Sequence, residues 1–238
     1  LSRLDTAFQR EQTFSSDMAH ELRTPLAGLR STLEVALRKE REAAAYQTAI
    51  RGGLDITCQM QSVVDNLLTL VRVDAGQLKV HLRAVDLGAM IQHAWQPFTS
   101  TAALRTIHVR RLGDHECLIK TDPERFSQVL RNVFDNAVSY VNAGGEILIE
   151  VFREGRYVRL TIANSGSEVA AEDTTRVFER FWRGDKSRSG TGTHCGLGLC
   201  LSKRMIELLG GTIAAETEMG GIFRITIHLP AADGGDTP

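Results

Sequence analysis

The most informative stretch of the chain is residues 14–26, which read Phe14-Ser15-Ser16-Asp17-Met18-Ala19-His20-Glu21-Leu22-Arg23-Thr24-Pro25-Leu26. Read as a helix, it places its apolar side chains in one stripe that continues to residue 37. His20 lies roughly 160° from the middle of that stripe, with Thr24 one turn further along the same face and Glu21 beside it. The pattern predicts an imidazole held toward solvent on a rigid helix, next to a carboxylate.

Two long helices are expected in residues 1–76, which contain no strand-like alternation. The first extends to about residue 39, and Pro25 interrupts it because proline removes a backbone hydrogen bond. Charged residues 39–42 predict the turn, and Gly76 predicts the end of the second helix. The pair Gly52-Gly53 early in that helix predicts a local bend. Since two amphipathic helices cannot bury both stripes alone, we expect a homodimeric four-helix bundle.

Near residue 79 the sequence pattern changes to one that predicts an α/β domain. Strand-like runs occupy residues 79–85, 107–111, 117–120, 146–152, 157–163, 212–216 and 222–229, and helical runs occupy 87–103, 123–141 and 197–209. The last two strands predict a hairpin across Met219-Gly220-Gly221. We therefore expect a helical domain over residues 1–76, an α/β domain over 77–230 and a disordered tail over 231–238.

Composition excludes several classes of protein. The 238 residues carry a net charge of −1, which provides no general field for nucleic acid, so no nucleic-acid partner is expected. No run of 18 or more apolar residues is present. The four cysteines have no CxxC spacing, which indicates reduced thiols rather than a disulfide framework or a zinc site; they are Cys58, Cys117, Cys195 and Cys200.

Two asparagines in the predicted helix at 123–141 share one face. Asn132 and Asn136 are one turn apart, and Tyr140 follows one turn later. An amide oxygen is a neutral, hard ligand that suits Mg²⁺ when water and phosphate oxygens fill the other positions. The alternative is a surface helix with two ordinary polar side chains.

Two glycine-containing loops follow. Asn164-Ser165-Gly166-Ser167-Glu168 comes directly after a predicted strand. Cys195-Gly196-Leu197-Gly198-Leu199 precedes a predicted helix and follows a flexible stretch, 187–193. Glycine lets a backbone approach phosphate closely, and the first N–H groups of a helix attract anions, so the second loop is a candidate phosphate site.

These segments resemble, in order, the H, N, G1, F and G2 boxes of sensor histidine kinases, and together they span nearly the whole chain. The resemblance implies a dimeric two-helix hairpin followed by a Bergerat-type α/β sandwich that binds ATP and Mg²⁺. It implies that His20 accepts phosphate from ATP and passes it to an aspartate of a response regulator receiver domain. Glu21 is the candidate base, and Thr24 matches the position used for phosphatase activity.

The nucleotide site implied by the resemblance comprises Asn132, Asn136, Tyr140, Asn164, Gly166, Arg183, Gly196, Leu197, Gly198 and Leu199. In the family the residue at Asn136 ligates Mg²⁺, the aromatic at Tyr140 packs against the base, and the residue at Asn164 accepts a hydrogen bond from the adenine amino group. Arg183 lies in the F box, residues 177–183, where it matches a phosphate-contacting arginine, and Phe178 and Phe181 of the same box would anchor the stretch 187–193.

Three residues depart from the family pattern. Asn164 replaces an aspartate and Glu168 replaces a glycine, while Ser139 stands where relatives usually carry a cation. An amide accepts a hydrogen bond without charge assistance, and a lost cationic contact costs roughly 1.5–3 kcal/mol, so weaker ATP binding is expected. An asparagine like Asn164 also occurs in a subfamily resembling metal-responsive sensor kinases.

Two alternatives follow from these departures and from the fold. The chain could be a catalytically weak or silent dimeric scaffold that binds the regulator without productive use of ATP. It could also be a gyrase-like ATPase that drives a clamp, although the H box argues against that. The chain opens without an initiator methionine, and residues 1–8 look like the end of a signalling helix. We therefore expect the cytoplasmic portion of a bacterial inner-membrane protein, below an upstream membrane sensor module.

Overall fold

The computed structural model describes residues 2–114, 117–184 and 195–232, with the side chains of residues 2–17 and 20 outside the description. The described residues form two compact units. One contains residues up to Leu68, and the other contains Thr69 to Gly184 together with the residues from Gly196 onward. Among the described helices, none is both long and apolar enough to cross a membrane.

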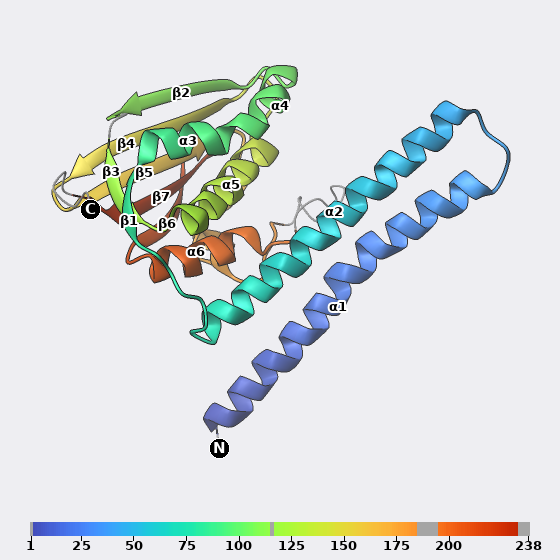
Figure 1. Ribbon diagram of the computed structural model, residues 1–238, viewed down its shortest axis with the longest axis horizontal. Helices are drawn as coiled ribbons and strands as arrows, with labels where there is room; N and C mark the ends of the chain where they lie inside the picture. Colours follow the sequence, from blue (N-terminus) through green and yellow to red (C-terminus); the bar gives the residue numbers. More distant parts are fainter. Residues whose placement is uncertain (1, 115–116, 185–194, 233–238) are drawn as a thin grey trace. The chain divides into compact units, whose positions relative to one another are not determined.

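The first unit is a helical hairpin. Helix α1 (Ser2–Leu37) runs without a break through Pro25, and helix α2 (Ala43–Asp74) lies antiparallel beside it (Figure 1). Gly53 is buried in α2, and a Cβ atom placed on it would lie 3.2 Å from Cδ1 of Leu29 in α1. The small residue therefore lets the two helices approach. Helix α2 is continuous through Gly52-Gly53, and the expected bend there stays a prediction.

The end of α2 is confirmed as predicted. Gly76 has a φ of +64°, and its N–H donates to the carbonyl oxygen of Val73 at 2.9 Å. The N–H of Gln77 donates to the carbonyl oxygen of Arg72, also at 2.9 Å. A glycine in the left-handed region closes a helix in this way because it has no Cβ to clash with the backbone.

The second unit contains a five-stranded sheet in the order β2-β4-β5-β7-β6. Its strands are β2 (His108–Gly113), β4 (Glu146–Glu154), β5 (Tyr157–Asn164), β6 (Thr212–Glu218) and β7 (Ile222–Pro230). Neighbours are antiparallel except β2 and β4, which are parallel. The predicted hairpin at Met219-Gly220-Gly221 joins β6 to β7.

A separate antiparallel pair consists of β1 (Arg83–Asp86) and β3 (Leu118–Thr121). The strand expected over 79–85 therefore begins only at Arg83. One reason is that the N–H of His81 donates to Oδ2 of Asp122 at 2.9 Å instead of joining a strand. The tail expected over 231–238 is wrong for its first two residues, because Ala231 bridges to Ile119 and the N–H of Ala232 donates to the carbonyl oxygen of Leu118. The rest of that expected tail, residues 233–238, lies outside the described residues.

Helices cover one face of the sheet (Figure 1). They are α3 (Leu87–Trp95), α5 (Pro123–Tyr140) and α6 (Gly198–Leu208), with α4 (Thr99–Leu104) beyond α3 and short 3-10 turns η1 (Gln96–Phe98), η2 (Ala171–Asp173) and η3 (Arg176–Phe178). The single helix expected over 87–103 is wrong, because η1 divides it. Pro97 lies in that turn and cannot donate a backbone hydrogen bond.

The core lies between the sheet and these helices. Alternate residues of β4 and β7 are buried, as expected for strands with one covered face. The central strand β5 differs, because its residues 160–164 are all buried. Phe126, Leu130 and Phe134 on α5 are fully buried, and the ring of Phe134 meets Trp95 of α3 edge-on at 5.3 Å between centroids. This packing fixes α5 against the sheet.

Asp122 caps the N-terminus of α5. Its Oδ1 accepts hydrogen bonds from the N–H groups of Glu124 at 3.0 Å and Arg125 at 3.2 Å, in addition to the bond from His81 to Oδ2. Burial alone raises the pKa of the Asp122 carboxyl, but the three backbone donors outweigh it, so the pKa lies below its ordinary value. The ionised carboxylate therefore stabilises both α5 and its connection to residue 81.

We predict that Asp122→Ala lowers the free energy of unfolding by about 1–2 kcal/mol at neutral pH, the usual cost of a lost cap. Because the folded pKa is depressed, the stabilisation is present above the ordinary pKa and is lost as the pH falls through the folded pKa. Denaturant unfolding of both proteins at several pH values measures this difference. Asp86→Ala, at the exposed cap of α3, is the matched control and should cost less. A difference between wild type and Asp122→Ala that stays constant with pH would contradict the role given to the charge.

Candidate active site

Helix α5 connects two of the predicted boxes. Nδ2 of Asn132 donates to the carbonyl oxygen of Gly198, the first residue of α6, at 3.2 Å. Asn136, one turn further along, is half-buried, and its side chain has no hydrogen-bond partner among the described residues. Tyr140 ends the helix with 38% of its surface exposed. The amide of Asn136 is therefore available to a ligand beside the start of α6.

Arg105 fixes the C-terminal end of α5. Its Nη1 donates to the carbonyl oxygen of Val138, and its Nη2 donates to that of Val141. These carbonyls lie at the end of the helix, where backbone acceptors lack partners within the helix. No pattern in the sequence predicts this contact, because Arg105 belongs to none of the five boxes. Its effect is to hold the helix end that carries Tyr140.

The loop after β5 is fixed by a second network. Asn164 is only 2% exposed; its Nδ2 donates to the carbonyl oxygen of Ser165 at 3.2 Å, and its Oδ1 accepts no hydrogen bond from the described residues. Oγ of Ser165 donates to Oδ1 of Asn142 at 2.8 Å and accepts from the N–H of Glu146 at 2.9 Å. Gly166 has a φ of +81°, and a Cβ there would lie 2.7 Å from Oδ1 of Asn142. The loop thus requires glycine at 166, and within the described part of the chain it leaves Oδ1 of Asn164 without a hydrogen-bond donor.

The glycine loop before α6 packs against the F box. The N–H of Phe181 donates to the carbonyl oxygen of Gly196 at 3.0 Å. Gly196 has a φ of +68°, and a Cβ there would lie 2.7 Å from the carbonyl carbon of Phe181 and 2.7 Å from the carbonyl oxygen of Trp182. Leu197 is fully buried, and Oγ of Ser202 donates to the carbonyl oxygen of Gly198 at 2.8 Å. The first N–H groups of α6 are therefore held in place next to residues 181–184.

The structure brings together the boxes of the second unit. Helix α5 carries the N box and contacts both α6, which follows the glycine loop, and β5, which precedes the loop at Asn164. Arg183 lies half-buried in the segment that packs on Gly196, while Ser139 and Glu168 are exposed.

In the first unit, Glu21 is half-buried and Thr24 is exposed on α1. The backbone of His20 is helical, but its side chain, and the stretch 187–193, lie outside the described part of the structure. The outward orientation expected for the His20 ring therefore stays a prediction.

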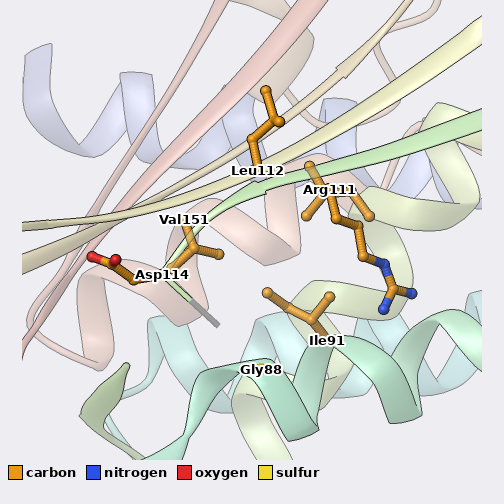
Figure 2. Close-up of a pocket in the computed structure, with 7 residues that line it drawn as sticks. Gly88, Ile91, Arg111, Leu112, Asp114 and Val151 are labelled. Atoms are coloured by element: carbon orange, nitrogen blue, oxygen red, sulfur yellow. The ribbon is translucent and has the colours of Figure 1, made fainter. Parts of the chain in front are cut away.

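Two cavities lie elsewhere, between α3 and the edge strand β2. The smaller, of about 30 Å³, has room for about one water molecule; Ile91 and Val151 line it, with Arg111 at its rim (Figure 2). The larger, about 490 Å³, is an open groove beside it that includes His93, Trp95 and Arg111. Their lining residues, all from the described ranges, belong to none of the five boxes. These cavities are distinct from the predicted nucleotide site.

Two family descriptions match complementary parts of the chain. Residues 10–76 match the His Kinase A (phospho-acceptor) domain, and residues 121–233 match the histidine kinase-, DNA gyrase B- and HSP90-like ATPase. The chain belongs to the sensor histidine kinase family. A phospho-acceptor segment joined to the ATPase also counts against the gyrase-like clamp, which needs no such segment.

Relatives of this kinase agree with that assignment. Sensor histidine kinase CusS of Escherichia coli O6:H1 is 31% identical over 231 residues, which are 97% of this chain and 48% of that protein. Sensor protein CzcS of Cupriavidus metallidurans is 31% identical over 230 residues, again 97% of this chain and 48% of that protein. The chain spans about half the length of the curated relatives it matches.

Solved structures confirm the predicted fold of the kinase. The Acinetobacter baumannii histidine kinase AdeS superposes with a TM-score of 0.71 at 23% identity, covering 90% of this chain and 98% of that chain. Histidine kinase ThkA, solved in complex with the response regulator protein TrrA, superposes with a TM-score of 0.72 at 19% identity, covering 97% of this chain and 64% of that chain. A helical hairpin followed by an α/β sandwich is therefore the architecture of this chain.

We predict that Gly196→Ala weakens Mg·ATP binding by at least about tenfold, a loss of about 1.4 kcal/mol. The new Cβ would displace the backbone of Phe181 and Trp182 from the glycine loop. Isothermal titration calorimetry with a non-hydrolysable ATP analogue measures the change. Gly155→Ala is the matched control, because Gly155 has a similar φ of +62° but nothing within 4 Å of a Cβ. Equal affinities of the two variants would rule out a specific role for the contact at Gly196.

Proposed function

We propose that this chain transfers the terminal phosphoryl group of ATP to His20 and then to an aspartate of a response regulator receiver domain. The observation that carries the proposal is the bond from Asn132 to Gly198, which places the N box beside the phosphate loop in a chain with a phospho-acceptor hairpin. Phosphoryl transfer requires alignment and charge neutralisation more than covalent help. In the proposed site, the Mg²⁺ ligand, Arg183 and the backbone N–H groups of the glycine loop would meet these requirements at the phosphates.

In the proposed transfer, one imidazole nitrogen of His20 attacks the γ-phosphorus, and the bond to the bridging oxygen of ADP breaks. The proton leaves the other imidazole nitrogen for the carboxylate of Glu21, which follows His20 in α1. General-base help of this kind contributes on the order of 10²–10⁴ in rate. Thr24, exposed one turn from His20, is proposed to orient water for dephosphorylation of the regulator.

Asn136 is the proposed Mg²⁺ ligand. Its half-buried amide has no hydrogen-bond partner among the described residues, and a neutral oxygen suits an ion that keeps water and phosphate oxygens. When bound, Mg²⁺ would neutralise charge on the phosphates. The residues present therefore fit the ion, and Asn132 maintains the helix spacing beside it.

The rest of the nucleotide is assigned to the other boxes. Oδ1 of Asn164, which accepts no hydrogen bond from the described residues, would accept one from the adenine amino group. Gly166 shapes the loop of Asn164, and Tyr140 would pack against the base. Arg183 and the backbone from Gly196 through Leu197, Gly198 and Leu199 hold phosphate oxygens.

A homodimer is proposed because the hairpin leaves apolar side chains uncovered. Leu26 is 54% exposed on α1, and Ile50 and Leu54 are 64% and 62% exposed on α2. A second copy would bury such stripes in a four-helix bundle. The matched segment is the phospho-acceptor domain expected to dimerise.

The partner and the setting are proposals of the same kind. The ThkA structure contains a response regulator, and we infer a receiver domain as the partner of this chain too. The chain spans about half the length of its relatives, and we propose that it is the cytoplasmic part of a bacterial inner-membrane sensor. Its proposed domains are a phospho-acceptor domain at 1–76 and a catalytic domain at 77–230.

We predict that His20→Gln abolishes acid-labile labelling from radioactive Mg·ATP while nucleotide affinity stays at the wild-type value. The reason is that the variant loses the phosphate acceptor but keeps every group of the second unit. His108→Gln, which changes an exposed histidine on β2, should label normally. Labelling of His20→Gln at the wild-type rate would show that another residue accepts phosphate. A wild-type chain that binds the regulator but never labels would favour the silent scaffold.

A further inference from the structure

Asp74 forms an ion-pair cluster with two arginines, Arg180 and Arg204, at the edge of the proposed nucleotide site. It is the last residue of α2 and belongs to the second unit. Its Oδ2 pairs with Nη2 of Arg180, which precedes Phe181 in the F box, and its Oδ1 lies 3.6 Å from Nε of Arg204 on α6. One carboxylate thus joins three elements: the end of α2, the F box and α6.

The helix itself does not explain this carboxylate. A negative charge in the last turn of a helix faces the negative end of the helix dipole, which is unfavourable. Asp74 is also 36% exposed and Arg180 is 35% exposed at the side chain, and ion pairs with that exposure contribute little to global stability. Arg180 and Arg204 compensate the negative charge of Asp74. We therefore expect Asp74 to affect the positions of these two arginines more than the stability of the fold.

Arg180 is joined to the most constrained residue of the site. Phe181, the next residue, has a φ of +60°, a conformation that side-chain-bearing residues keep only when their surroundings hold them. Its N–H donates to the carbonyl oxygen of Gly196 at 3.0 Å. Arg183 lies two residues further along the same segment. Holding Arg180 therefore restrains the backbone that connects the glycine loop to Arg183.

We propose that Asp74 is a positioning residue for phosphate binding. Its carboxylate holds Arg180, and through the backbone at Phe181 it keeps Arg183 at the phosphate end of the site. The inference rests on the proposed function in one respect, the assignment of Arg183 to phosphate. Because Asp74 ends α2, a displacement of that helix end would alter nucleotide affinity through a single ion-pair cluster.

The test is a double-mutant cycle on the whole chain, with the dissociation constant of Mg·AMPPNP as the readout. Asp74→Asn keeps the shape and removes the charge, and should weaken binding about three- to tenfold. Arg183→Ala should weaken binding as well. If Asp74 acts through Arg183, the double variant binds no more weakly than Arg183→Ala alone. Asp74→Glu, which restores the charge, should recover most of the affinity.

Two controls separate positioning from general destabilisation. Glu207→Gln removes the other carboxylate of Arg204, whose Nη1 lies 3.2 Å from Oε2 of Glu207, and leaves the pair of Asp74 with Arg180 intact. It should bind nucleotide as the wild type does. The melting temperature of Asp74→Asn should match that of Glu207→Gln, since both lose an exposed ion pair.

Two results would overturn the role of Asp74: an unchanged dissociation constant in Asp74→Asn, or additive losses in the double variant. Either can occur while the wild type still labels on His20, which leaves the proposed function standing. Conversely, a wild type that binds nucleotide without labelling would refute the kinase reaction, while the binding cycle would still decide the role of Asp74.

Discussion

The hydrogen bond from Asn132 to the carbonyl oxygen of Gly198 is the contact on which the nucleotide site depends. It joins α5, which carries the proposed Mg²⁺ ligand, to the N-terminus of α6, which is proposed to offer backbone N–H groups to phosphate. The bond holds only because both helices are packed on the sheet and buried at their inner faces. Packing of the hydrophobic core thus sets the positions of the two helices, and the side-chain amide of Asn132 links them at the site.

Two hydrogen-bonded loops extend this arrangement toward the proposed ends of a nucleotide. Asn142 and Ser165 hold the loop of Asn164, the proposed partner of the base, and the contact of Phe181 with Gly196 holds the loop proposed to bind phosphate. Glycines 166 and 196 occur where any Cβ would collide with backbone or side-chain atoms. The departures at Ser139 and Glu168 fall on exposed positions outside these contacts. The framework of an ATP site is therefore intact even where its charge differs from the family pattern.

Local features of this fold could be predicted from the sequence. The end of α2 at Gly76 and the β6–β7 turn at Gly220-Gly221 depend on residues a few positions apart, and both are confirmed. The break between α3 and α4 also depends on a nearby residue, Pro97. The apolar pattern nevertheless predicts one helix over 87–103, because it continues across Pro97. Long-range contacts could not be predicted. The parallel pairing of β2 with β4, the bond of Arg105 to the end of α5 and the pair of Asp74 with Arg180 join distant segments without any repeating signal.

The most direct measurement is the effect of Mg²⁺ on nucleotide affinity, determined by calorimetry with AMPPNP in the presence of Mg²⁺ or of EDTA. We expect Mg²⁺ to tighten binding to the wild type. In Asn136→Ala this gain should vanish, while the affinity in EDTA stays unchanged, because only the ligand to the ion has been removed. A gain from Mg²⁺ that is as large in Asn136→Ala as in the wild type would contradict the site described for this kinase.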